Sequence, residues 1–216
     1  MNIIVERFNK IKLNIASTKP SKPVNIIAVS KTFSKAHIRP LIEHGHNHFG
    51  ENKVQEASAK WSEIKKDNQS LKLHMIGKLQ SNKAKDAVKI FDYIHSLDNQ
   101  KLADSLAKYQ NKLNKNLEYF IQVNIGNEIQ KSGIPVNQLD PFYNYCINDI
   151  NLKIIGLMVI PPNDNKPEKY FKTLNELNKS LALENLSMGM SADYIEAIKY
   201  GATFVRIGSS IFGSRS

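Results

Sequence analysis

The sequence contains a single cysteine, Cys146, among its 216 residues. One cysteine cannot form an internal disulfide, and a reducing compartment is consistent with this composition. No apolar run approaches the roughly 20 residues that span a bilayer. The N-terminal stretch MNIIVERFNKIKLNIA carries Glu6 and several lysines, which is typical of an amphipathic helix and not of a signal peptide. We therefore expect a cytoplasmic protein without a membrane partner.

Arginine is scarce, since the 30 basic residues are 26 lysines and 4 arginines, against 20 acidic residues. The resulting formal charge of +10 is a feature of many nucleic-acid-binding proteins. The lysines are spread over predicted helix faces, however, and no basic tract is interleaved with aromatic residues. We interpret the charge as a bias of the solvated surface and expect no specific nucleic-acid partner.

Glycine is also sparse, with 10 residues, and no G-x-G-x-x-G follows the first predicted strand, so a dinucleotide-binding fold has no support. The chain does contain short apolar runs that alternate with amphipathic stretches. The predicted strands cover residues 24–30, 47–49, 71–76, 92–96, 118–124, 153–159, 185–188 and 203–207. The predicted helices cover the N-terminal stretch and residues 35–44, 51–66, 79–90, 98–113, 137–148, 166–182 and 191–200.

Eight strand–helix alternations imply parallel strands that are joined by crossover helices. In a chain of this length they predict an α/β fold, a single (β/α)8 TIM-type barrel domain over residues 1–216 with an extra N-terminal helix. An open doubly wound sheet is the alternative. Pro40 lies deep in the helix predicted over 35–44, so we expect this helix to start late or to be kinked.

Polar and glycine residues gather where the predicted strands end, which is where such a barrel carries its chemistry. Lys31 follows the first strand and Asn52 follows the second. SMGMS (187–191) lies at the end of the seventh strand, and Gly208 and Ser209 follow the eighth, where this architecture binds phosphate groups. The alternative interpretation is that these glycines and serines are turn residues and helix N-caps.

Lys31 ends the apolar run VNIIAVSK. One explanation is that its stem packs while its ammonium group reaches solvent. The other is Schiff-base chemistry, because an amine in an apolar pocket becomes available to attack an aldehyde. Pyridoxal 5′-phosphate (PLP) carries an aldehyde and a phosphate together. Arg206 also stands out, because it interrupts an apolar strand in a chain with few arginines.

Three histidines, His46, His48 and His74, do not show the spacing of metal ligands with any cysteine or glutamate pair. We expect structural or surface roles for them and no metal site.

Longer blocks resemble the YggS/PROSC family, the PLP homeostasis proteins. These blocks are AVSKT, HFGENKVQEA, HMIGKLQSNK, QVN…KSG, GLM and LSMGMSADYIEAIKYGATFVRIGSSIFGSR, collinear over about residues 24–215. The family is similar to the N-terminal barrel of alanine racemase, the fold type III arrangement of PLP enzymes. The resemblance implies that Lys31 holds PLP as a Schiff base. It further implies cofactor contacts from Asn52, Ser187, Gly189, Arg206, Gly208 and Ser209, with Arg206 at the pyridine nitrogen and the glycines and serines at the phosphate.

A pyridine nitrogen that faces Arg206 must accept a hydrogen bond and stay unprotonated, because arginine only donates. Such a cofactor is a poor electron sink. A racemase of this fold adds a tyrosine base from a second domain, whereas this chain shows no such domain and none of its eight tyrosines ends a predicted strand. We expect a monomer that binds PLP and hands it to apo-PLP enzymes without efficient amino-acid turnover.

Two alternatives remain open from the sequence. The first is a small fold type III enzyme such as an amino-acid racemase. The second is a nucleic-acid- or protein-binding regulator with PLP as its effector.

Overall fold

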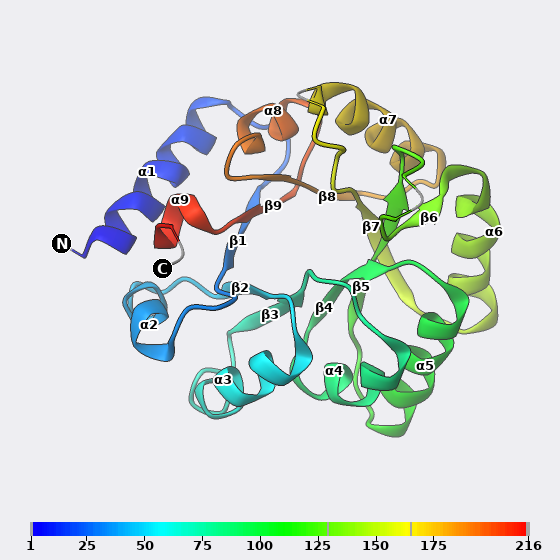
Figure 1. Ribbon diagram of the computed structural model, residues 1–216, viewed down its shortest axis with the longest axis horizontal. Helices are drawn as coiled ribbons and strands as arrows, with labels where there is room; N and C mark the ends of the chain where they lie inside the picture. The colour runs from blue at the N-terminus through cyan, green and yellow to red at the C-terminus, as the bar shows by residue number, and fades with distance from the viewer. Residues whose placement is uncertain (1, 129, 165, 215–216) are drawn as a thin grey trace.

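Parallel strands close into a barrel within residues 2–128, 130–164 and 166–214, which the computed structural model describes (Figure 1). The strand order is β4-β3-β2-β1-β9-β8-β7-β5, and β5 pairs back with β4 to close the ring of eight. Helices surround this ring, so the predicted (β/α)8 barrel is confirmed and the open doubly wound sheet is wrong.

Each predicted strand overlaps one strand of the barrel. The barrel strands are β1 (Asn25–Val29), β2 (His48–Glu51), β3 (Lys72–Met75), β4 (Tyr93–Leu97), β5 (Glu118–Asn124), β7 (Lys153–Met158), β8 (Asn185–Met190) and β9 (Phe204–Ile207). The sequence did not predict β6 (Ile134–Pro135), a two-residue strand that pairs with β5 outside the ring. A strand this short has too few residues for a periodic pattern.

The helices follow the predicted order. They are α1 (Ile3–Ser17), α2 (Lys35–Glu43), α3 (Val54–Asp67), α4 (Ala84–Ile90), α5 (Gln100–Lys112), α6 (Leu139–Asn144), α7 (Pro167–Ser180), α8 (Tyr194–Lys199) and α9 (Ser209–Phe212). Short helical turns are η1 (Ser81–Lys83), η2 (Val136–Gln138) and the π-helical η3 (Tyr145–Asp149).

The extra N-terminal helix α1 is amphipathic as predicted, and it buries one face that includes Phe8 and Ile11. Asn2 caps it, since its side chain accepts a hydrogen bond from the Ile4 amide. In Figure 1 this helix takes a place in the outer ring between α8 and α2, beside the four-residue α9. Helix α1 therefore covers a part of the barrel that the short α9 leaves open.

Pro40 lies inside α2, which begins at Lys35 directly after its N-cap, Ser34. The expectation of a late start is therefore wrong. Although a proline inside a helix removes one N–H donor and crowds the carbonyl four residues before it, the Ser34 side chain secures the first turn by accepting from the His37 amide.

The barrel interior and the layer beneath the helices form two separate hydrophobic clusters. The inner cluster consists of Ile27, Phe120, Met158 and Phe204. Alternate residues of each strand point inward, so these side chains fill the barrel while their neighbours pack against the helices. The inner cluster is small because polar rings share the interior; His95, for example, stacks on Phe120 at 4.3 Å between ring centroids.

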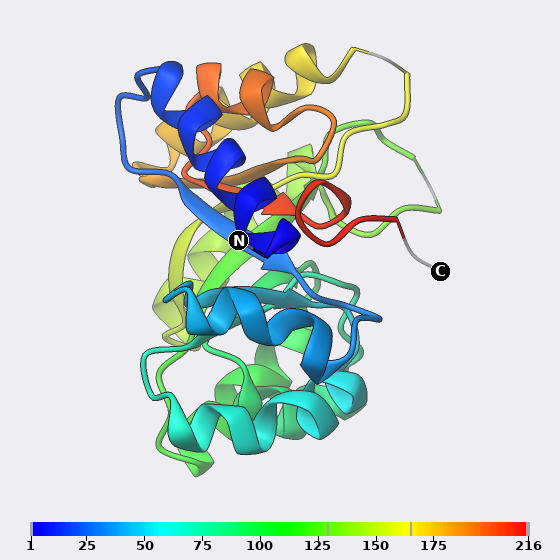
Figure 2. The same cartoon turned by 90° about the vertical axis from the view of Figure 1, so that its left-hand side faces the viewer.

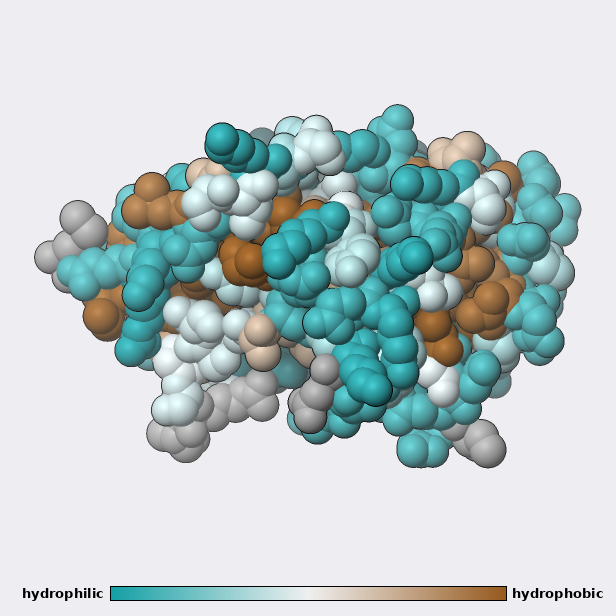
Figure 3. Space-filling view, turned by 90° about the horizontal axis from the view of Figure 1, so that it is seen from above, coloured by the Kyte–Doolittle hydropathy of each residue, from teal (hydrophilic) through white to brown (hydrophobic). Residues whose placement is uncertain are grey.

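The loops that follow the strands meet at one end of the barrel. In Figure 2 this end lies on the right, where α9 and the loops after β5 and β7 are seen together. Figure 3 looks onto α1, α7 and α8 and shows a mainly hydrophilic face. Within the described ranges, no helix combines the length and apolar character needed to cross a membrane.

Candidate functional site

A cavity of about 560 Å³ opens at the C-terminal ends of β1, β2, β8 and β9. Among the predicted site residues, those that line it are Lys31, Asn52, Arg206, Gly208 and Ser209. The other lining residues are Val29, Phe33, Ile76, Ile160, Met190, Ser191, Ala192 and Gly213. The fold thus brings an amine, a guanidinium group and the loops after the last two strands to one place.

Lys31 lies two residues beyond the end of β1 and is partly exposed at the cavity. The chain turns sharply behind it, because the Phe33 amide donates to the Ser30 carbonyl at 3.1 Å. Thr32 adopts the left-handed conformation with φ of 69°, which is uncommon for a residue with a side chain and recurs at functional sites. The Thr32 amide donates to the Glu56 carboxylate of α3, so the turn is tied to a neighbouring helix.

A buried ion pair between Glu51 and Lys60 supports this turn from below. Glu51 Oε1 accepts from Lys60 Nζ at 3.0 Å, from Ser30 Oγ at 2.7 Å and from Trp61 Nε1 at 2.9 Å. Lys60 also donates to the Ser30 carbonyl at 2.8 Å. Glu51 is fully buried and Lys60 is 8% exposed, so the pair is shielded from water. Because loss of one partner of a buried pair is strongly destabilising, these contacts fix the backbone that presents Lys31.

Asn52 reaches the cavity from the end of β2, as predicted. Its backbone lies against Gly77, where an added Cβ would come within 2.5 Å of the Asn52 carbonyl oxygen. Glycine is required there by close approach of two backbones, which accounts for the glycine after the third predicted strand.

Arg206 lies at the floor of the cavity and is 4% exposed. Its Nη1 donates to the carbonyl and the hydroxyl of Ser187 at 2.8 and 2.7 Å, and its Nη2 donates to the Val159 carbonyl at 2.9 Å. Burial lowers the pKa of Arg206 to about 10, so the guanidinium remains charged at neutral pH. Within the described chain these are its protein acceptors, which leaves Nε–H and one Nη2 hydrogen for an acceptor in the cavity.

Ser187 and Gly189 do not line the cavity, in contrast to the other predicted residues. Ser187 is fully buried beneath it, and its hydroxyl is bonded to Arg206 and to His95. Gly189 has a φ of +91°, and an added Cβ would lie 2.7 Å from the Cβ of Ala197. This glycine allows the turn at the end of β8.

Met190, Ser191 and Ala192 take the place expected for Ser187 and Gly189 at the cavity wall. The block SMGMS does predict cavity residues at this strand end. Because β8 ends at Met190 and not at residue 188, however, the residues that line the cavity lie further along the chain than expected. Met190 and Ile160 form an apolar part of the rim and are 39% and 40% exposed.

The predicted structural role of the histidines is borne out for His74, which is fully buried inside the barrel. His46 and His48 are partly exposed near the start of β2. Among the described residues, no group of three or more His, Cys, Asp or Glu side chains is arranged to hold a metal ion.

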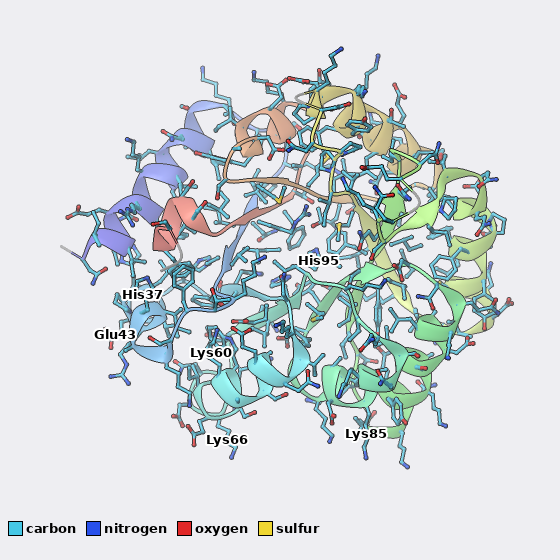
Figure 4. All side chains as sticks on the ribbon, viewed as in Figure 1. His37, Glu43, Lys60, Lys66, Lys85 and His95 are labelled. Atoms are coloured by element: carbon cyan, nitrogen blue, oxygen red, sulfur yellow. The ribbon has the colours of Figure 1, made fainter. Side chains whose placement is uncertain are left out.

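A larger groove of about 820 Å³ lies between α3 and α4, away from the strand ends. Lysines line much of it, and some of them are ion-paired, such as Lys65 with Asp92 and Lys89 with Asp86. Figure 4 shows Lys66 of this groove pointing outward, whereas Lys60 lies between α3 and the barrel. Flexible surface lysines without convergent buried groups do not form a built binding site, so the smaller cavity is the better candidate.

Comparison with known proteins shows which family the chain belongs to. Residues 8–216 match the family model described as "Alanine racemase, N-terminal domain". A "Pyridoxal phosphate homeostasis protein" of Aquifex aeolicus is 40% identical over 199 residues, which cover 88% of this chain and 86% of that protein. The chain belongs to the family of pyridoxal phosphate homeostasis proteins. The resemblance expected from the sequence is therefore confirmed.

Solved structures of PipY from Synechococcus elongatus share this family fold. The structure without PLP has a TM-score of 0.88 and 36% identity, and covers 98% of this chain and 100% of that chain. The structure with PLP bound has a TM-score of 0.86 and 35% identity, and covers 97% of this chain and 100% of that chain. Alanine racemase of Clostridium difficile, at 13% identity and a TM-score of 0.73, covers 99% of this chain and 57% of that chain and shares the fold alone.

Proposed function

We propose that this protein binds PLP in the cavity at the ends of β1, β2, β8 and β9 and serves PLP homeostasis. The observation that carries the proposal is that Lys31, Arg206 and the Gly208–Ser209 loop line one cavity. The relative PipY, whose structure with PLP bound matches this fold over 97% of the chain, supports the choice of ligand.

The residues of the cavity fit the groups of PLP. Bound there, PLP supplies an aldehyde that an amine can attack, and we assign this amine to Lys31 as the site of a Schiff base. The two free donor hydrogens of Arg206 suit the pyridine nitrogen, which accepts a hydrogen bond. Ser191, Gly208 and Ser209 offer hydroxyl and main-chain N–H groups for the phosphate. Asn52 lies on the same wall as Lys31 and serves as a further cofactor contact.

Catalytic turnover of amino acids is not part of the proposal. Among the described lining residues, the titratable side chains are Lys31 and Arg206, and no tyrosine or histidine joins them. Arg206 is charged and only donates, so it cannot remove a proton from a substrate. A racemase needs two groups that exchange protons with the substrate, and this wall offers one amine.

The role in homeostasis requires that bound PLP can leave the protein. Lys31 is only partly buried, and the apolar rim residues Met190 and Ile160 are exposed. We propose transfer to apo-PLP enzymes from this open face. A single chain supplies the whole cavity, so we treat the monomer as the acting unit, which light scattering of the purified protein tests.

The test begins with purified protein and added PLP. We expect a Schiff-base absorbance band and, after reduction with borohydride, a label that peptide mapping assigns to Lys31. Lys31→Ala should lose both signals. Lys78→Ala, which removes an exposed lysine on the neighbouring loop after β3, is the matched control and should keep them.

Two results would overturn parts of this proposal. Attachment of PLP at another residue, or a full signal in Lys31→Ala, would refute the assignment of the amine. Racemisation or decarboxylation at an ordinary enzyme rate, on the order of 1 s⁻¹ or more, would refute the absence of turnover.

A further inference from the structure

A continuous chain of hydrogen bonds crosses the barrel interior beneath the cavity. Arg206 Nη1 lies 2.7 Å from Ser187 Oγ, which lies 2.8 Å from His95 Nδ1. His95 Nε2 lies 2.9 Å from His74 Nδ1, and His74 Nε2 lies 2.9 Å from His48 Nδ1. The chain therefore links the guanidinium group at the cavity to a histidine at the start of β2, near the opposite end of the barrel. We call it the histidine relay.

Arg206 sets the direction of every bond in the histidine relay. Arginine can only donate, so Ser187 Oγ accepts from it. Among the hydrogen-bond contacts of the described residues, His95 Nδ1 is the acceptor next to the Ser187 hydroxyl proton, so we assign that proton to the bond with His95. His95 must then carry its proton on Nε2 and donate to His74 Nδ1. By the same rule His74 donates from Nε2 to His48 Nδ1. All three imidazoles are thus assigned the Nε2–H form.

Neutral imidazoles are required for this arrangement, because a protonated ring has two donors and no acceptor. His74 and His95 are fully buried. Burial lowers the pKa of both rings well below the ordinary value, and the charge of Arg206 lowers that of His95 further. His95 lies near the barrel axis in Figure 4, surrounded by the inner strands.

The histidine relay also contributes to the surroundings of the buried Arg206 guanidinium. Within the described part of the chain, Arg206 forms no direct ion pair, and the carboxylate of Asp193 favours its charged form from a longer distance. The acceptors are instead two carbonyls and the Ser187 hydroxyl. Because every O–H and N–H of the relay points away from Arg206, the negative ends of the aligned dipoles face the guanidinium, and each bond polarises the next.

We propose that His95, His74 and His48 are positioning residues that act through Ser187 to hold Arg206 correctly oriented at the cavity. The inference rests on the proposed PLP site for its functional consequence. Its structural content, the direction of the relay and its effect on the Arg206 guanidinium, concerns the protein without any ligand.

The first measurement uses the wild-type protein without PLP. Long-range ¹H–¹⁵N correlation spectra at about pH 7.5 should show His74 and His95 as neutral Nε2–H tautomers. An Nδ1–H tautomer or an imidazolium at either residue would overturn the proposal, because the donors would then point the wrong way.

The second measurement compares His95→Gln with His95→Leu. Glutamine keeps one acceptor and one donor, whereas leucine removes both. We expect faster exchange of the Arg206 guanidinium protons and weaker PLP binding in His95→Leu, each by about tenfold, and changes within about threefold in His95→Gln. His44→Gln, which alters an exposed histidine outside the relay, should match wild type. Unchanged Arg206 exchange in His95→Leu would refute the relay.

If His95→Leu does not fold, His48→Leu replaces it, because His48 lies at the partly exposed end of the histidine relay. This variant should also speed exchange of the Arg206 guanidinium protons. If the wild-type protein binds no PLP, the proposed function is refuted. The histidine tautomers and the exchange of the Arg206 guanidinium protons would still test the histidine relay.

Discussion

Two buried polar networks flank the cavity, and they balance charge in opposite ways. Beneath Lys31, the Glu51 carboxylate is paired with the Lys60 ammonium at 3.0 Å. Beneath Arg206, the charge is met by carbonyls, a hydroxyl and the neutral imidazoles of the histidine relay. The comparison teaches that one barrel can bury one cation in direct contact with a carboxylate, and another in contact with carbonyls and a hydroxyl while the carboxylate of Asp193 acts from a longer distance.

The two networks also differ in how the chain assembles them. Glu51 and Lys60 are nine residues apart, and a long flexible lysine can adjust to its partner. The relay takes its side chains from β2, β3, β4, β8 and β9, and rigid rings leave little room for adjustment. Substitutions in the Glu51–Lys60 pair should therefore change stability through charge. Substitutions in the histidine relay should change it through geometry and protonation.

Acid should affect the histidine side most strongly. The pKa values of buried His74 and His95 lie well below the ordinary 6.5, so the unfolded chain takes up protons that the folded protein refuses. The two neutral rings therefore make their full contribution to the free energy of unfolding above pH 6.5, and this contribution falls as the pH drops below 6.5. We therefore expect the free energy of unfolding to be lower at pH 5 than at pH 7.5, with His46, whose pKa burial lowers to about 4, contributing in the same direction. Urea unfolding at about pH 7.5 and pH 5 measures it, and equal free energies at both would contradict neutral rings.

Lys60→Met removes the Glu51–Lys60 ion pair and should have the next largest effect on the free energy of unfolding. It leaves the Glu51 carboxylate buried without its cation, at a cost of about 3 kcal/mol in the free energy of unfolding. Lys66→Met changes an exposed lysine on the same helix and should alter stability by less than about 0.5 kcal/mol. Equal urea midpoints for the two variants would show that the pair adds nothing.

Ser187→Ala separates Arg206 from the histidines. His95 Nδ1 then lacks a donor, and we expect a loss of about 1–2 kcal/mol. Ser191→Ala, at the cavity wall, should leave the unfolding free energy within about 0.5 kcal/mol of wild type. Thermal and urea unfolding of both variants test whether the buried serine is part of the relay or only fills space.

Glu56→Gln should have the smallest effect on stability, below about 1 kcal/mol, because the pair of Glu56 with Lys60 is partly exposed. Its effect should be local. A neutral amide is a weaker acceptor for the Thr32 amide, so hydrogen exchange at Thr32 should rise by up to about fivefold. A global change in exchange with no response at Thr32 would show that the turn behind Lys31 does not depend on this contact.

The fold could be predicted from the sequence because its signals are local and repeated. Each barrel strand is a short apolar run followed by an amphipathic stretch, and the helix is continuous even where Pro40 lies inside α2. The sequence did not predict β6 and α9, because elements of two and four residues are too short to show a period.

The cavity was predicted less completely. Lys31 and Ser209 follow strands and Arg206 lies one residue before the end of β9, and the topology of a barrel brings strand ends together. Ser187 carries a residue type that suits a phosphate, yet it faces the interior and holds Arg206. A shift of one residue along a strand turns a side chain to the other face, and sequence pattern alone does not resolve that register.

By itself, the sequence determined the alternation of strands and helices, the amine at the end of β1 and the membership of the family. Only the tertiary structure decided that His48, His74 and His95 join into one oriented chain, and that Lys60 among so many lysines is buried. The reason is physical. Periodicity records which face of an element meets the core, whereas hydrogen bonds between strands distant in sequence depend on closure of the barrel and on which inward side chains it sets within about 3 Å of each other.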